Sequence, residues 1–122
     1  MTEPTLTVYK ASAGSGKTFT LAKEYIKLLI ENPEAYRNIL AVTFTNKATE
    51  EMKMRILSQL YGLWKQLPDS ESYMASLEKD FSQMKNVRDF ISQQAGKALR
   101  SMLDNYHFFR VQTIDAFIRL SL

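Results

Sequence analysis

Residues 11–18 read Ala-Ser-Ala-Gly-Ser-Gly-Lys-Thr, which matches the phosphate-loop pattern except that Ala11 stands where the first glycine is usual. A β-prone run at residues 6–9 precedes this segment, and apolar residues at helical spacing follow it from Lys17 to Glu31. We therefore expect a strand, a tight loop and a helix in that order, the setting in which such a loop binds phosphate. This feature predicts a parallel α/β fold built around a nucleotide.

The residue types of the loop explain its chemistry. Gly14 and Gly16 permit backbone conformations and a close approach that a Cβ would block, so that successive amides can point at one anion. The helix that follows adds its positive dipole end, Lys17 can place its charge on the β and γ phosphates, and Thr18 can offer a hydroxyl to Mg²⁺. The predicted nucleotide-binding residues are Ser12, Ala13, Gly14, Ser15, Gly16, Lys17 and Thr18, with Lys17 as the catalytic residue and Thr18 as the metal ligand.

The rest of the chain alternates between strand and helix patterns. The apolar run at residues 39–43 predicts a strand that is covered on both faces, and a helix is expected from about Asn46 to Trp64. A polar break at 66–72, a shorter helix at about 74–84, a helix capped by Asn86 that continues to about Asn105, a strand near 108–112 and a helix opening at Asp115 complete the order. The methionines and Trp64 fall at core spacings. These patterns predict one parallel α/β domain.

Composition sets limits on the class of protein. The 122 residues are 45% hydrophobic and 24% charged, no apolar run is long enough to cross a membrane, and there is no cysteine. We therefore expect a cytoplasmic protein without disulfides or thiolate metal sites. The net charge of +3 is small and dispersed, so it tolerates a polyanionic partner without establishing one. His107, the single histidine, lies among aromatic residues and is expected to pack.

Two further segments resemble a known family. Residues 43–52, Thr-Phe-Thr-Asn-Lys-Ala-Thr-Glu-Glu-Met, resemble motif Ia of superfamily 1 helicases of the UvrD and RecB kind, and residues 111–117 resemble the next motif. Residues 9–20 are most similar to the RecB and AddA branch of helicase-nucleases in double-strand break repair. The resemblance implies a RecA-like P-loop NTPase fold, a three-layer parallel sheet with helices on both faces and a helical insertion at about 65–105. It also implies ATP and Mg²⁺ as cofactors and single-stranded DNA as partner.

The resemblance gives the two later segments a role in binding DNA. The expected DNA-binding residues are Thr43, Phe44, Thr45, Asn46, Lys47, Thr113 and Phe117. Their chemistry permits this, since short polar groups at a strand-to-helix junction can hold phosphates and a ring can stack on a base. The residues alone also allow Phe44 to be core and Thr45 or Asn46 to cap a helix. Asp115 stands where the family more often has histidine, and we expect it to cap the terminal helix.

Phosphoryl transfer also needs an acidic Walker B segment and an arginine, and no Walker B segment is present in these residues. We therefore expect the chain to be the amino-terminal piece of a longer helicase, to bind nucleotide weakly and to hydrolyse it negligibly by itself. Sheet edges left open in such a piece would favour self-association. The alternatives are a small-molecule P-loop kinase and a nucleotide-binding module without hydrolysis.

Overall fold

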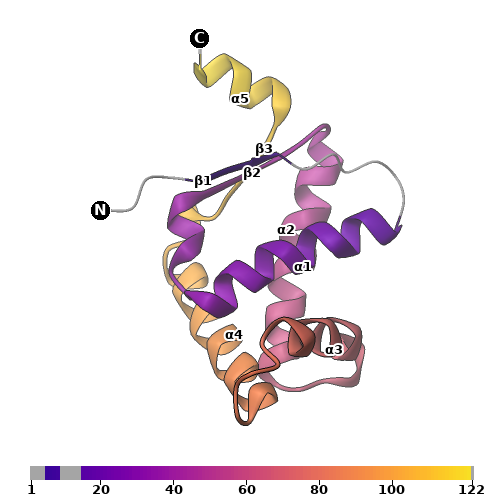
Figure 1. Ribbon diagram of the computed structural model, residues 1–122. Coiled ribbons are helices and arrows are strands. Elements are labelled where there is room, and N and C mark those ends of the chain that lie inside the picture. Colours follow the sequence, from indigo (N-terminus) through magenta and orange to yellow (C-terminus); the bar gives the residue numbers. More distant parts are fainter. Residues whose placement is uncertain (1–4, 9–14, 122) are drawn as a thin grey trace.

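The structure is a computed structural model that describes residues 5–8 and 15–121 (Figure 1). Its strands and helices alternate in the expected order. They are β1 (Thr5–Val8), α1 (Ser15–Glu31), β2 (Ile39–Thr43), α2 (Asn46–Trp64), α3 (Glu71–Asp80), α4 (Val87–Asp104), β3 (Arg110–Thr113) and α5 (Ile114–Ser121). Three short 3₁₀ turns join them: η1 (Ala35–Asn38), η2 (Pro68–Ser70) and η3 (Tyr106–Phe108). No helix in these two described ranges is long and apolar enough to span a membrane.

The three strands form one small parallel sheet in the order β1-β2-β3. Its register aligns Val8 with Val42 and Val42 with Gln112, and it aligns Thr43 with Thr113. Strand β2 occupies the residues that the apolar run predicts, because a strand covered on both faces needs no alternation of polar and apolar residues. The parallel sheet is therefore confirmed, within a mostly helical α/β fold.

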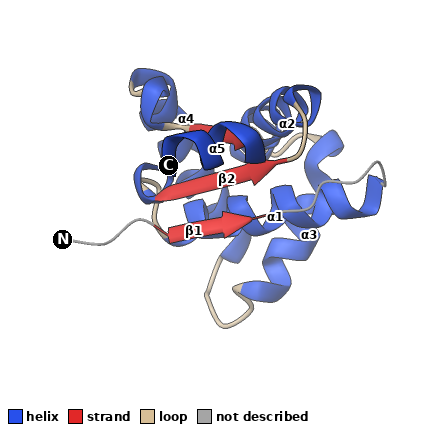
Figure 2. Ribbon diagram, turned by 90° about the horizontal axis from the view of Figure 1, so that it is seen from above, coloured by secondary structure: helices blue, strands red, loops and turns tan. Residues whose placement is uncertain are grey.

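Helices lie on both faces of the sheet (Figures 1 and 2). Figure 1 shows α5 above the sheet and the other four helices below it. Side chains alternate accordingly along β2: Ile39 and Ala41 belong to the core shared with α1, α2 and α4, whereas buried Val42 lies outside that cluster. One face is thus covered by a thick helical layer and the other by α5.

The helical layer contains the main core. The predicted apolar faces of α1, α2 and α4 are buried almost completely: Ala22, Tyr25, Ile26, Leu29, Met52, Ile56, Leu60, Leu63, Ile91, Ala95, Ala98 and Met102. Helix α4 packs on both α1 and α2, so the expected helical insertion contributes to the core. The core prediction is wrong for Met54, which lies off the apolar stripe of α2, and for Met84, because the helix expected at about 74–84 ends at Asp80 and leaves Met84 in an exposed turn.

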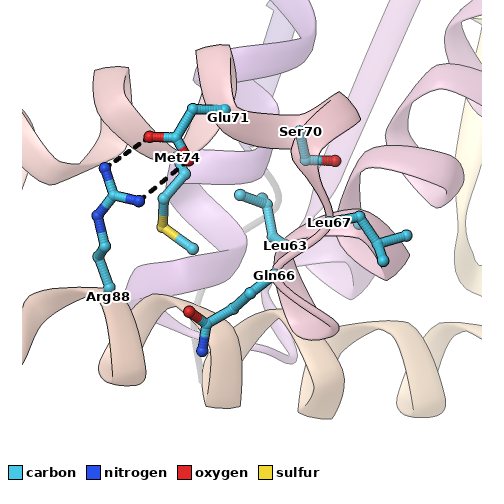
Figure 3. A pocket seen from close by; sticks show the side chains of 8 residues that line it. Leu63, Gln66, Leu67, Ser70, Glu71, Met74 and Arg88 are labelled. Carbon is cyan, nitrogen blue, oxygen red and sulfur yellow. Dashed lines mark hydrogen bonds and ion pairs between the residues drawn. The ribbon is translucent and has the colours of Figure 1, made fainter.

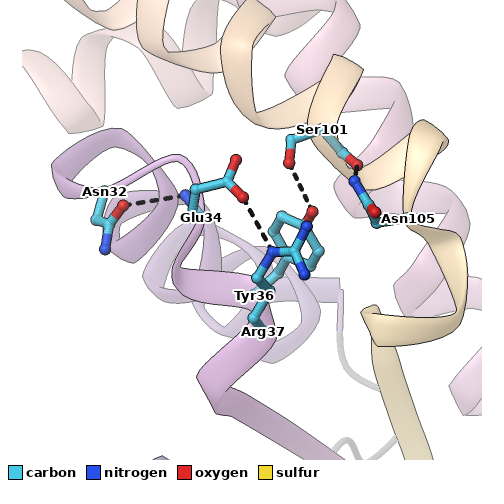
Figure 4. A network of polar contacts seen from close by, with 6 residues as sticks. All are labelled: Asn32, Glu34, Tyr36, Arg37, Ser101 and Asn105. Atoms are coloured by element: carbon cyan, nitrogen blue, oxygen red, sulfur yellow. Dashed lines mark hydrogen bonds and ion pairs between the residues drawn. The ribbon is translucent and has the colours of Figure 1, made fainter. Parts of the chain in front are cut away.

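A polar network ties the segment before β2 to α4 (Figure 4). The buried Tyr36 places its hydroxyl 2.6 Å from the hydroxyl of Ser101, and the Nε of Arg37 donates to the carboxylate of Glu34 over 3.0 Å. Hydrogen bonding from Ser101, with a smaller contribution from Arg37, lowers the pKa of Glu34. This network fixes the amino-terminal end of β2, at the edge of the sheet opposite to the carboxyl ends of the strands.

A second polar cluster joins α3 to α4. The guanidinium of Arg88 donates to Glu71 and Glu78, with the shortest contact at 2.6 Å, so that the pKa of Arg88 is raised and that of Glu71 is lowered by their hydrogen bonds (Figure 3). The cavity next to it, lined partly by Leu63 and Met74, measures about 60 Å³. Such a volume holds about two waters and no nucleotide.

The start of α4 differs from the expectation. Asn86 occupies the N-cap position but makes no side-chain cap bond, because its backbone is left-handed, with φ 53° and ψ 47°. Asparagine tolerates this conformation better than most residues. Its role is to turn the chain into α4, so the expected capping bond is wrong.

Candidate nucleotide and nucleic-acid edge

The carboxyl ends of the three strands meet at one edge of the sheet. Since the strands are parallel and in register, their carboxyl ends at Val8, Thr43 and Thr113 lie side by side. Strands β2 and β3 lead into α2 and α5, whose amino-terminal ends therefore begin near this edge, and α1 is the helix that follows β1 in the chain. Exposed amides and positive dipole ends make such an edge the usual ligand site of parallel α/β folds.

The phosphate loop lies between β1 and α1. Ser12, Ala13 and Gly14 are outside the described residues, whereas the backbone of Ser15 and Gly16 opens α1. Lys17 is exposed and Thr18 is half-buried in the next positions. The first turn of α1 carries no acidic residue, so this helix end fits the charge of a triphosphate with its metal ion.

The β2–α2 junction is built around a threonine cap. Thr45 has extended backbone, and its Oγ1 accepts the amide of Ala48 over 3.0 Å. Thr45 therefore caps the helix, which was one of the two open readings of this residue. Asn46 and Lys47 are exposed in the first turn, which again lacks an acidic residue.

Phe44 and Thr43 differ in their exposure to solvent at this junction. Phe44 is 48% exposed, so the reading of Phe44 as core is wrong, and its ring is free to meet a ligand at the surface. Thr43 is 1% exposed, and its hydroxyl lies 2.6 Å from that of Thr49 and 3.2 Å from the carbonyl of Thr45. Its hydroxyl is thus engaged within the protein, where it holds β2 to the first turn of α2.

The β3–α5 junction has the same cap with a different charge. The Oγ1 of Thr113 accepts the amide of Ala116 over 3.2 Å. The expected cap by Asp115 is therefore wrong, because α5 begins one residue earlier and leaves Asp115 inside its first turn. Asp115 is exposed there, and Phe117 is half-buried two residues further along.

One residue of the junction was missed by the sequence analysis. Thr49 is 8% exposed and provides the partner of the Thr43 hydroxyl. The signal was a threonine in the first turn of a helix that immediately follows a buried strand, but only the fold pairs it with Thr43. His107, expected to pack, is exposed, with its ring centroid 4.1 Å from that of Phe108.

Comparison with known proteins gives one family match. The family model described as the UvrD/REP helicase N-terminal domain matches residues 2–117. No solved structure matches the chain significantly.

Curated relatives match over shorter segments. The RecBCD enzyme subunit RecB of Chlamydia muridarum is 54% identical over 52 residues, which cover 42% of this chain and 5% of that protein. RecB of Chlamydia pneumoniae is 35% identical over 111 residues, which cover 89% of this chain and 10% of that protein. The ATP-dependent DNA helicase PcrA of Bacillus subtilis is 54% identical over 50 residues, which cover 41% of this chain and 7% of that protein. The chain thus spans a tenth or less of the length of these relatives.

Proposed function

Because the chain belongs to the family of UvrD/REP helicase N-terminal domains, we propose that it is the ATP-binding part of an ATP-dependent DNA helicase or translocase. The observation that carries this proposal is the shared edge of the sheet. Parallel register brings the two threonine-capped helix ends that follow β2 and β3 to the edge at which β1, the strand that precedes the phosphate loop in the chain, also ends. One edge then offers neighbouring positions for a triphosphate and for the phosphates of a DNA strand.

Residues 12–18 would hold the nucleotide. Lys17 would bind the β and γ phosphates as a point charge, and Thr18 would contribute its hydroxyl to Mg²⁺. Bound Mg-ATP would supply the free energy of phosphate hydrolysis to the motor. The absence of a carboxylate from the first turn of α1 supports this assignment, since an acidic residue there would repel the triphosphate.

DNA would lie across the two junctions that follow. Exposed Phe44 would stack on a base, and the amides at the start of α2 with Asn46 and Lys47 would hold backbone phosphates. Thr45 would shape this helix end through its cap, and buried Thr43 would position the junction without touching the strand. Thr113 and Phe117 would contribute a second contact from the β3–α5 junction.

The wider assignment follows the relatives. Several of them carry the name RecBCD enzyme subunit RecB, and one is an ATP-dependent DNA helicase. We therefore place the whole protein among helicases that process DNA ends in double-strand break repair. Membership of a helicase family removes the support for a small-molecule kinase. The nucleotide-binding module without hydrolysis remains the description that we expect for residues 1–122 by themselves.

The test of nucleotide binding is calorimetric titration of the chain with Mg-ATP. We expect Lys17→Ala to weaken binding at least tenfold, because a charge-assisted hydrogen bond contributes roughly 1.5–3 kcal/mol. Lys79→Ala, which removes an exposed lysine from α3, is the matched control and should leave the affinity unchanged. Equal affinity of the Lys17 variant and the unaltered chain would refute the assignment.

The expected self-association is a separate prediction. It is checked by light scattering of the chain over a range of concentrations. A monomer at high concentration would contradict it.

A further inference from the structure

A cluster of aromatic and basic side chains lies where the end of α2 packs against α4. It consists of Tyr61, Trp64 and Lys65 from α2 and its C-cap, and of Gly96 and Arg100 from α4, and we call it the Trp64 seam. Figure 1 shows α2 leading away from the sheet toward this end. A helix of this length places Trp64 about 27 Å from Asn46, so the seam is separate from the edge described above.

The indole of Trp64 is fixed in place by α4. A Cβ added at Gly96 would lie 2.6 Å from two atoms of the indole ring, so the ring occupies the space above that glycine. The hydroxyl of Ser92 donates to the carbonyl of Trp64 over 2.6 Å. Glycine in the middle of a helix costs about 1 kcal/mol relative to alanine, and here it permits this close approach. The position of the indole ring is therefore fixed by the protein in the absence of a ligand.

Two cations converge on this ring. The Nζ of Lys65 lies 4.0 Å from the ring centroid of Trp64, and the Cζ of Arg100 lies 5.4 Å from it. No described carboxylate pairs with either cation. Other described cations fall into both groups: Lys23, Arg37, Lys47 and Arg88 each have an acidic partner, whereas Lys27, Lys53 and Lys97 have none. The quadrupole of the indole attracts both cations but leaves their charge uncompensated.

A second pair extends the same side of α2. The Nζ of Lys53 lies 5.4 Å from the ring centroid of Tyr106 in η3. Lys53 and Trp64 are eleven residues apart, which is close to three helical turns, so both face the same way at a separation of about 16 Å. Lys97, exposed on α4 three residues before Arg100, adds another positive charge to this side. The cations therefore form a line rather than a point, and Asp104, exposed one turn after Arg100, is an acidic residue on the same face of α4.

We propose that the Trp64 seam binds the phosphate backbone of a nucleic acid, as a second contact outside the ATP and DNA edge. A line of cations without acidic partners is complementary to a regularly charged polyanion. The indole already contacts Gly96 on α4 and two cations, so its role is to orient Lys65 and Arg100, and a base need not stack on it. The contact is independent of base sequence and sensitive to salt.

The fluorescence of Trp64 can report on binding at the seam, because Trp64 is the single tryptophan of the chain. Titration with a 20-nucleotide oligothymidylate should change the Trp64 emission as phosphates draw the cations away from the ring. The change should disappear at high salt, since phosphate contacts are replaced by counterions. Emission that stays constant at an oligonucleotide concentration that saturates binding would overturn the proposal.

A pair of charge-matched double variants localises the contact. Lys65→Gln with Arg100→Gln should reduce the slope of log affinity against log salt concentration by about 1.4, or roughly 0.7 for each single-strand phosphate contact. Lys79→Gln with Lys85→Gln removes the same charge from exposed positions outside the seam and should leave the slope unchanged. Equal slopes for the two double variants would mean that only net charge matters, which overturns the proposal.

Two further titrations identify the kind of anion that binds at the seam. Inorganic phosphate and polyglutamate, each at matched ionic strength, should change Trp64 emission much less than the oligonucleotide does. An equal response to either would make the seam a general anion site and overturn the assignment to nucleic acid. Phe44→Ala should leave the emission change at saturation intact, so that failure of the DNA edge is distinguished from failure of the seam.

Discussion

The β2–α2 and β3–α5 junctions have the same kind of helix cap, but the first helical turn after the cap carries opposite charge in the two. In both, a parallel strand ends, a threonine caps the next helix, and its hydroxyl accepts the amide three residues later, in Ala48 or Ala116. The first turn of α2 then presents Lys47 and no acid, whereas the first turn of α5 presents Asp115. The backbone geometry of an anion site is thus present twice, but only the first copy has no carboxylate in the first turn of its helix.

This difference teaches that a capped helix end is not by itself a phosphate site. Phe44 projects from the first junction with about half of its surface exposed, and Phe117 of the second is half-buried. The first junction therefore combines an exposed ring, a basic side chain and free dipole ends. We expect it to provide most of the affinity for DNA at this edge, and the second to contribute less.

The largest expected effect is on stacking. Phe44→Ala should lower the affinity for single-stranded oligothymidylate about thirtyfold, because one base stacked on an aromatic ring contributes roughly 2 kcal/mol. The free energy of unfolding should change little, since the ring is half exposed. Fluorescence anisotropy and urea unfolding measure the two quantities. Phe117→Ala is the matched variant at the second junction, and a larger loss of DNA affinity there than for Phe44→Ala would reverse the comparison.

The next effect concerns the buried hydroxyl that supports the first junction. Thr43→Val should lower the free energy of unfolding by about 1.5 kcal/mol, because the hydroxyl of Thr49 loses its partner in a buried place. Thr43→Ser keeps the hydroxyl and should recover most of this stability. Urea unfolding provides the measurement. If DNA affinity fell while stability was preserved, Thr43 would contact the strand directly and its positioning role would be wrong.

The loss of either threonine cap should have a smaller effect on stability, and the two caps can be compared with each other. Thr45→Ala and Thr113→Ala should each cost about 1 kcal/mol of stability through the lost cap bond. Circular dichroism during urea unfolding reports the loss, and hydrogen exchange assigns it to the first turn of α2 or α5. Substitution by serine is the control in each case. Loss of protection in both helices after one substitution would show that the caps are coupled.

The smallest effect is electrostatic, and it has opposite signs at the two junctions. Lys47→Gln should weaken binding of single-stranded DNA two- to threefold, and Asp115→Asn should strengthen it by a similar factor, as expected for about 0.5 kcal/mol per charge at a helix end. Both differences should shrink in high salt. Anisotropy titrations at two salt concentrations give the result. Weaker binding by the Asp115 variant would mean that its carboxylate assists the site.

Local patterns predicted the elements well because each depends on near neighbours. The apolar run at 39–43 gave the bounds of β2, and the faces of α1 and α4 were read correctly from helical spacing. The errors arose where a partner comes from elsewhere in the fold. The expected cap by Asp115 is made by Thr113 instead, because the helix starts one residue earlier. The partner of the Thr43 hydroxyl, Thr49, was not predicted, because only the fold brings the two together. The roles of residues 12–14 in the loop, and those of the DNA contacts, remain predictions.

The sequence by itself determined the order of strands and helices, the buried stripes and the family, since periodicity and short motifs are properties of neighbouring residues. The tertiary structure decided which threonines cap helices and which is buried, and it brought Lys65 and Arg100 onto one indole. These outcomes depend on strand register and on helix packing, which join residues far apart in the chain. No local pattern encodes such pairings, because the partner of each group is fixed only when the elements pack together.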